Sequence, residues 1–139
     1  METGTEQTAR TAAAEIEEHH RFIEEWLRGT ADPGLLGGFV AMHTPDFTLC
    51  GPDGGVLDRD AVASGFGGGH GAAPGIGVRI RGVRLVAAEG ALVVAAYEEH
   101  QEAPSSVRRS TVVFARDPGA RNGLRWKHLH ETWIAPPEG

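Results

Sequence analysis

The period of the apolar residues changes near Ile76, and this change limits the folds open to the chain. After Ile76, apolar and polar residues alternate as they do in β-strands, whereas the clearest earlier segment has the spacing of an α-helix. Four alternating segments follow one another with short connections: residues 76–87, 91–101, 105–115 and 124–134. Their spacing predicts a meander of neighbouring antiparallel strands.

Within the first of these segments, Gly82 resets the alternation. Val78 and Ile80 precede it on one face, and Val83 and Leu85 continue the apolar face after it. A glycine in such a position is typical of a β-bulge, so we expect a long strand that bends at Gly82.

Residues 11–29 form the segment with helical spacing. Its apolar stripe runs through Ile16, either His19 or His20, and Ile23, and a glycine follows its last residue as a C-terminal cap. This pattern predicts a long amphipathic helix near the N-terminus.

Shorter elements are expected between the long helix and the alternating segments. Asp32 is suited to be the N-cap of a second helix with Pro33 in its first position, and Asp58 is suited to cap a third. Between these two helices, residues 46–50 alternate like a strand.

The order of these elements predicts an α+β domain in which a curved antiparallel sheet packs one face on helices that precede most of it. One domain is expected over residues 11–135, because the periodic segments are continuous there. Residues 1–10 and 136–139 are expected to be tails, the first of them flexible.

Composition excludes several classes of partner. The chain has 139 residues, enough to bury a core without disulfides, and Cys50 is its single cysteine. A net charge of −6 gives no basic footprint for a nucleic acid. No apolar run approaches bilayer length, and the polar start lacks the basic and apolar regions of a signal peptide. We therefore expect a cytoplasmic protein without nucleic-acid or membrane partners.

The chain resembles the nuclear transport factor 2-like superfamily, in particular its SnoaL-like (polyketide cyclase-like) small proteins. The resemblance is carried by IEEHHRFIEEWLRG, HTPDFTLCGPDG, AYEEHQ, RRSTVVF and GLRWKHLHETW. It extends from about residue 12 to residue 134. It implies a cone, or cystatin-like roll, in which a strongly bent sheet wraps the first helix and leaves a pocket between them. This fold serves enzymes and non-enzymatic modules alike, so the residues must decide the function.

One enzymatic branch can be tested directly against the sequence. In the steroid isomerases that this chain resembles, a general-base Asp precedes the Pro of the turn after the first strand, and a Tyr on the first helix donates to the oxyanion. The corresponding residues here are Gly51, before Pro52, and Phe22. Both chemical groups are missing, so this mechanism is not expected.

The resemblance turns Glu98 and Glu131 into the pocket, with Lys127 on the same strand face as Glu131. Two glutamates in an apolar cone would repel, and the pKa of one would rise toward the range of a general acid. We predict Glu98 and Glu131 as catalytic residues, helped by His100. The structural alternatives are a solvated Glu98 and an ion pair of Lys127 with one of the glutamates.

Apolar and aromatic side chains are expected to line the pocket or to fill the core around it. The predicted ligand-binding residues are Phe22, Trp26, Phe47, Phe114, Lys127, Leu129 and Trp133.

Arg108 and Arg109 lie on opposite faces of their strand, so at most one of them can enter the pocket. An inward arginine would hold a carboxylate or an enolate. The alternative is an exposed pair near the sheet edge, where positive charge discourages aggregation.

The other face of the last strand carries Trp126, His128 and His130. In many relatives this convex face packs against a second subunit, so the resemblance implies a homodimer through these residues. A His-x-His pair on one face could also bind zinc, but no Cys or carboxylate stands at a supporting spacing. Neither a metal nor a cofactor is predicted.

Two functions remain open at this point. The first is a cofactor-independent cyclase, isomerase or dehydratase that acts on a small, largely apolar, oxygenated metabolite by acid–base catalysis. The second is a non-catalytic homodimeric module that binds a ligand in the same cone. Convergence of polar side chains in the pocket separates the two.

Overall fold

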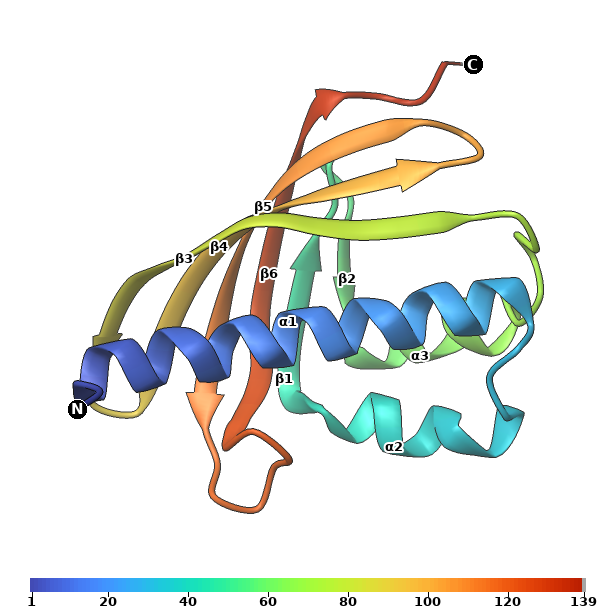
Figure 1. Ribbon diagram of the computed structural model, residues 1–139. Helices are drawn as coiled ribbons and strands as arrows, with labels where there is room; N and C mark the ends of the chain where they lie inside the picture. Colours follow the sequence, from blue (N-terminus) through green and yellow to red (C-terminus); the bar gives the residue numbers. More distant parts are fainter. Residues whose placement is uncertain (139) are drawn as a thin grey trace.

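The structure is a computed structural model that describes residues 1–138. Within these residues the elements are α1 (Gly4–Arg28), a short 3-10 helix η1 (Pro33–Leu35), α2 (Leu36–Ala41), β1 (His43–Cys50), β2 (Val56–Asp58), α3 (Arg59–Gly67), β3 (Gly77–Glu89), β4 (Leu92–Glu102), β5 (Ser106–Arg116) and β6 (Leu124–Ala135). The predicted α+β class is confirmed: α1 lies along one face of a curved sheet, and α2 and α3 lie near one end of it (Figure 1).

The long helix α1 begins at Gly4, inside the segment 1–10 that was predicted to be a tail. The Thr3 side chain caps it by accepting a hydrogen bond from the backbone N–H of Glu6. Residues 4–10 lack an apolar stripe, which explains why periodicity did not reveal this part of the helix. At the other end, Gly29 has φ 83°, the left-handed conformation of a C-terminal cap.

The predicted caps of the shorter helices are confirmed. Asp32 accepts from the N–H of Gly34 at the start of η1, which continues into α2. Asp58 accepts from the N–H of Ala61 at the start of α3.

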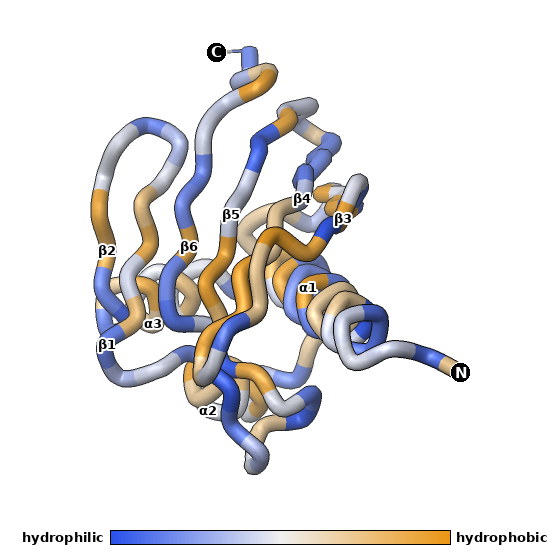
Figure 2. The backbone as a smooth tube through the Cα atoms, turned by 90° about the vertical axis from the view of Figure 1, so that its left-hand side faces the viewer, coloured by the Kyte–Doolittle hydropathy of each residue, from blue (hydrophilic) through white to orange (hydrophobic). Residues whose placement is uncertain are grey.

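The sheet has six strands within the described residues, in the order β2-β1-β6-β5-β4-β3. The meander from β3 to β6 is antiparallel as predicted, but β1 pairs with β6 in parallel, so the sheet is mixed. Spacing along the chain predicts only pairs of consecutive strands, and β1 and β6 are far apart in sequence. Seen from the side, the strands form a curved row beside α1 (Figure 2).

Two of the irregularities in the strand pairing bear on the predicted strand faces. Gly82 has φ 64° and lies where the pairing of β3 with β4 shifts, which confirms the predicted bulge. The second irregularity is in β6, where Phe114 pairs with Trp126 and Val113 pairs with His128. Lys127 is therefore an extra residue, and strict alternation fails at this point.

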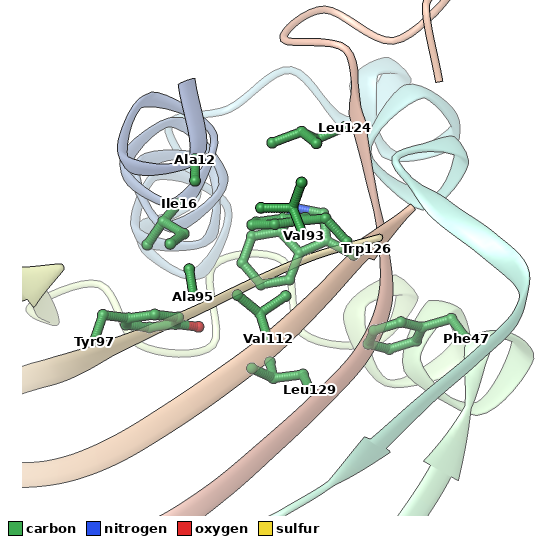
Figure 3. Packing of buried hydrophobic residues seen from close by; sticks show 11 residues of the cluster. Ala12, Ile16, Phe47, Val93, Ala95, Tyr97, Val112, Leu124, Trp126 and Leu129 are labelled. Atoms are coloured by element: carbon green, nitrogen blue, oxygen red, sulfur yellow. The ribbon is translucent and has the colours of Figure 1, made fainter. Parts of the chain in front are cut away.

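The bulge at Lys127 corrects the predicted position of Trp126. This side chain was expected on the convex face, but it is completely buried in the core and packs edge-to-face on Phe114. Trp126 lies with Leu129 among side chains from α1, β1, β4, β5 and β6 that pack between the helix and the sheet (Figure 3).

An ion pair between the exposed Arg121 and the buried Glu15 fixes the loop after β5 to α1. Glu15 is completely buried, and its carboxylate accepts two hydrogen bonds from Arg121, both at 3.0 Å. Asn122 and the indole N–H of Trp126 donate to the same carboxylate. All of these donors come from residues more than 100 positions later in the chain.

Among residues 1–138, no helix combines the length and the apolar character that are needed to cross a bilayer.

Candidate functional site

The candidate site is a cavity of about 170 Å³ between α1, the inner face of the sheet, α2 and α3. Its apolar wall is formed by Ile23, Phe39, Phe47, Leu49, Val62, Phe66 and Leu129. Its polar side chains are His19, His20, His43, Glu99, Gln101, Arg108 and Glu131. Titratable groups that converge in an apolar cavity are the usual sign of a binding or catalytic site.

A larger hollow of about 550 Å³ lies at the connection between β4 and β5, but its character differs. Its wall includes the exposed side chains of Arg79 and Glu102, which form an ion pair with each other at 2.6 Å. Because these two charges are paired with each other and are exposed to solvent, they offer only a weak electrostatic attraction to a ligand. The inner cavity is therefore the candidate site.

His20 and Glu99 form a buried pair in the cavity. His20 Nε2 lies 3.1 Å from Glu99 Oε1, and its Nδ1 lies 2.8 Å from the carbonyl oxygen of Ile16. Both nitrogens face acceptors, so both carry hydrogen and the ring is an imidazolium. Burial alone would lower the pKa of His20, but the hydrogen bond and charge of Glu99 outweigh it and raise the pKa.

The same pair fixes the charge of Glu99. Burial by itself would raise the pKa of its carboxyl group, but the hydrogen bond and charge of His20, together with Arg108 and Gln101, lower it to about 2. Glu99 is therefore a carboxylate over the whole range in which a folded protein normally works.

Glu131 lies in the opposite electrostatic situation. Burial and the negative charge of Glu99 raise the pKa of its carboxyl group, against the opposing effects of Arg108 and His20. Its hydrogen bonds are long: Arg108 Nη1 donates to Oε1 at 3.3 Å and Ser110 Oγ donates to Oε2 at 3.4 Å. Glu131 faces the cavity as the resemblance implied, but the carboxylate that helps to raise its pKa is Glu99 and not the predicted Glu98.

The side chains of His19 and His43, which both line the cavity, are hydrogen-bonded to each other. His43 Nδ1 lies 3.1 Å from the carbonyl oxygen of Phe39 and so carries hydrogen, which leaves its Nε2 as an acceptor. His19 Nε2, 3.0 Å away, must donate to it. Burial lowers the pKa of His43 to about 4, and burial also lowers the pKa of His19 well below its usual value, so both rings are neutral.

The structure places the other two predicted catalytic residues outside the cavity. Glu98 and His100 lie on the outer face of β4, where their side chains bond to each other at 2.9 Å and Glu98 also pairs with Arg109. Their neighbour Glu99 takes the inward position. The prediction for β4 was therefore wrong by one residue, which reverses the faces of the strand.

The predicted ligand-binding residues divide into three groups. Phe47 and Leu129 line the cavity. Trp26 and Phe114 are buried in the core outside it, and Phe22 stacks on Trp26 and Phe39. Core packing, the simpler interpretation of these aromatic residues, describes Trp26 and Phe114, whereas Phe22 is half-buried beside them.

Lys127 and Trp133 lie apart from the cavity wall. Lys127 Nζ pairs with Asp46 Oδ2 at 2.6 Å at the bulge of β6, so it contacts neither glutamate. The Trp133 ring packs against the guanidinium of Arg108, 4.7 Å from the ring centroid, and its N–H donates to Asp53. Trp133 thus contacts the site only through Arg108.

The outer face of β6 keeps His128 and His130 as predicted, but without Trp126. His128 Nδ1 lies 2.6 Å from Thr48 Oγ1 of β1, and His130 is exposed.

Five titratable residues of the cavity were not among the predicted site residues, and the sequence carries some signal for four of them. His19 and His20 occupy the apolar stripe of α1, where a buried histidine needs a partner. Glu99 shares a strand face with Tyr97, which is typical of an inner face. Arg108 was considered as an inward residue. No sequence signal connected His43 to the other histidines.

The fold and the buried cluster define the class of this protein: a cone-shaped α+β domain with an internal acid–base cavity. A 1.5 Å crystal structure of an NTF-2-like protein of unknown function from Pseudomonas aeruginosa is similar, with 35% identity, a TM-score of 0.84 and coverage of 90% of this chain and 99% of that one. The chain belongs to the NTF2-like superfamily.

More distant structures share the fold alone. An NTF2-like protein of unknown function in nutrient uptake from Rhodospirillum rubrum is 18% identical, with a TM-score of 0.65 and coverage of 87% and 97%. A Streptomyces avermitilis protein of the NTF2-like family, described as a proposed dehydratase, is 16% identical, with a TM-score of 0.64 and coverage of 91% and 99%. No protein-family profile and no curated protein matches the chain.

Proposed function

We propose that the chain is a SnoaL-like enzyme that performs cofactor-independent acid–base chemistry on a small, largely apolar, oxygenated molecule in the cone cavity. One observation carries this proposal. Glu99 and Glu131 line the same cavity, and the pKa of one is lowered to about 2 while that of the other is raised. Carboxyl groups with pKa values driven apart are typical of sites that transfer protons.

The geometry gives each group a role. Because the pKa of Glu131 is raised, its protonated form would give a proton to a leaving hydroxyl oxygen, and the resulting carboxylate would take one from the neighbouring carbon. Water then leaves and a carbon–carbon double bond forms. The His20 imidazolium, held by Glu99 at 3.1 Å, stabilises negative charge on a substrate oxygen. The same groups would serve an isomerisation or a cyclisation.

Two further observations support this class of reaction. The cavity wall is mainly apolar, which excludes water and strengthens electrostatic effects inside. The Streptomyces avermitilis protein of the same fold is described as a proposed dehydratase.

Proton exchange tests the proposal without knowledge of the natural substrate. Cyclohexanone and a β-hydroxy ketone of the same ring size are incubated with the protein in heavy water, and NMR follows deuterium incorporation and loss of water. We expect Glu131→Gln to reduce the rate by about 100-fold or more. Glu98→Gln, the matched change on the outer face, should keep the wild-type rate. Binding without exchange in the wild type would favour the non-catalytic module instead.

We also propose that a second copy of the chain covers the outer face of the sheet. One row of this face carries Thr132, Arg109, Glu98 and Arg81, directly paired across β6, β5, β4 and β3. Alternating charges of this kind can complement themselves in a two-fold interface. The partner would also cover His128 and His130. Light scattering should give the mass of a dimer, and Arg109→Glu should give a monomer; a wild-type monomer at micromolar concentration would contradict the proposal.

A further inference from the structure

Arg108 is the one lysine or arginine that lines the cavity, and its hydrogen bonding is incomplete. Its Nε is buried and has no partner among the described residues, and its bond to Glu131 is long at 3.3 Å. A guanidinium carries five N–H donors in a planar fork, and charge-assisted bonds are normally shorter than 3 Å. The cavity therefore leaves the buried Nε–H of this cation without an acceptor among the described residues.

The charged side chains of the cavity form two pairs of opposite charge. His20 and Glu99 neutralise each other, so Glu131 is the counter-charge of Arg108. Glu131 is faced by His20 from α1, by Glu99 and Tyr97 from β4 and by Arg108 and Ser110 from β5. The lining residues from α2 and α3 are apolar.

We infer that the cavity takes a small carboxylate, that Arg108 binds its carboxylate group, and that Glu131 takes up one proton in the complex. This substrate class rests on the acid–base function proposed above and makes it more specific. With the ligand bound, three carboxylates would surround Arg108 and His20, and protonation of one of them restores the balance. Glu131 is the one that accepts the proton, because Glu99 is held ionised by His20 at 3.1 Å.

Proton uptake would also prepare the catalytic group. A Glu131 that is protonated when the ligand binds starts the reaction as an acid, the form that a dehydration requires. The negative charge of the bound substrate would thus favour the protonated form of Glu131, which is the form that acts as the acid. This coupling of ligand binding to protonation needs no distant change in structure, because Arg108, His20, Glu99 and Glu131 all line one cavity.

The volume of the cavity limits the size of the ligand. An apolar cavity of about 150 Å³ is known to hold benzene, and this cavity has about 170 Å³. Phe39, Phe47 and Leu129 supply an apolar wall for such a ring. Benzoate, an aromatic ring with one carboxylate, is therefore a suitable probe, and benzamide is its uncharged control of similar shape.

The test is titration calorimetry with sodium benzoate, in pairs of buffers that differ in ionisation enthalpy, at about pH 6 and about pH 8. For the wild type we expect uptake of up to one proton, and an affinity that falls by up to tenfold for each pH unit above the pKa of Glu131. Benzamide should bind at least about tenfold more weakly, without proton uptake.

Two variants separate the parts of the inference. Arg108→Gln should lose at least about tenfold in benzoate affinity. Glu131→Gln keeps the arginine and should bind benzoate with no proton uptake and no dependence on pH in this range. Circular dichroism confirms that each variant is folded, and the comparison of benzoate with benzamide on the wild type needs no variant.

Three results would overturn the inference: no benzoate binding by the wild type, binding without proton uptake at both pH values, or equal affinity for benzoate and benzamide. The results that would disprove the proposed acid–base function differ from those that would disprove carboxylate binding. Benzoate binding with proton uptake, but without proton exchange on any ketone, would leave this inference standing and remove the enzyme proposal. Exchange on ketones without benzoate binding would do the reverse.

Discussion

The indole N–H of Trp126 donates a hydrogen bond of 2.8 Å to Glu15, and the face of the same ring stacks on His19 at 3.9 Å. One buried side chain of β6 thus contacts both the ion pair that holds the loop after β5 and the histidines of the cavity. The scaffold and the candidate site share this residue, so stability and site geometry are coupled through it.

Replacement of Trp126 tests this position directly. Trp126→Phe removes the bond to Glu15 and leaves a buried acceptor with one donor fewer, so we expect a loss of about 1–3 kcal/mol in the free energy of unfolding. Urea denaturation measures it. His130 lies on the exposed outer face of the same strand, so His130→Ala should change the free energy of unfolding little. Equal effects of the two substitutions would mean that Trp126 does not lie inside.

Among the cavity residues, we expect substitutions in the buried pair of His20 and Glu99 to lower the stability of the protein most. Glu99→Gln leaves a buried imidazolium without its counter-charge, and breaking a buried pair in this way costs about 3–5 kcal/mol. Glu98→Gln changes the same residue type one position away on the outer face and should have little effect on the denaturation midpoint. A larger loss from Glu98→Gln than from Glu99→Gln would reverse the assignment of the two strand faces.

The raised pKa of Glu131 predicts a pH dependence of stability. The folded protein keeps a proton on Glu131 that the unfolded chain releases, so this contribution is complete below the ordinary pKa of 4.5 and is lost as the pH rises through the raised value. As the pH rises above 4.5, the stability of the wild type should therefore fall relative to that of Glu131→Gln. Urea titrations at several pH values check this, with the exposed Glu25→Gln as a control that should follow the wild type. Parallel curves for wild type and Glu131→Gln would contradict the raised pKa.

The bulge at Gly82 predicts a difference between two glycines of the same strand. Gly82→Ala places a side chain at φ 64°, and the strain should lower stability by about 1–2 kcal/mol although the surrounding space is open. Gly77→Ala has no positive φ and meets only Glu102 Cβ at an ordinary 3.7 Å, so it should be close to neutral. Thermal unfolding of both variants gives the comparison, and a neutral Gly82→Ala would argue against the bulge.

Local features of this chain were predictable, because a few neighbouring residues determine them. The caps at Asp32 and Asp58 and the bulge at Gly82 are examples, since each depends on the chemistry of one residue in a short segment. The orientation of β4 was not predictable in this way. Residues 91–96 are apolar on both faces, so alternation cannot tell the inner face from the outer one.

Two other features depended on distant partners. The bulge in β6 carries no glycine, so nothing in GLRWKHLHETWI shows that Trp126 and Glu131 both face inward. The ionised state of Glu99 depends on His20, which lies on another element far away in the sequence. Glu131 could be found because its strand keeps regular alternation from His128 onward.

The extra residue at Lys127 also makes β6 tolerant of change in its length. Because Lys127 and His128 together occupy the place of one outward residue, loss of a single residue there would leave Trp126 in the core and Leu129 and Glu131 in the cavity. The two halves of the strand keep their orientation independently of each other. One residue could therefore be removed at this point while the inward side chains on both sides of it keep their places.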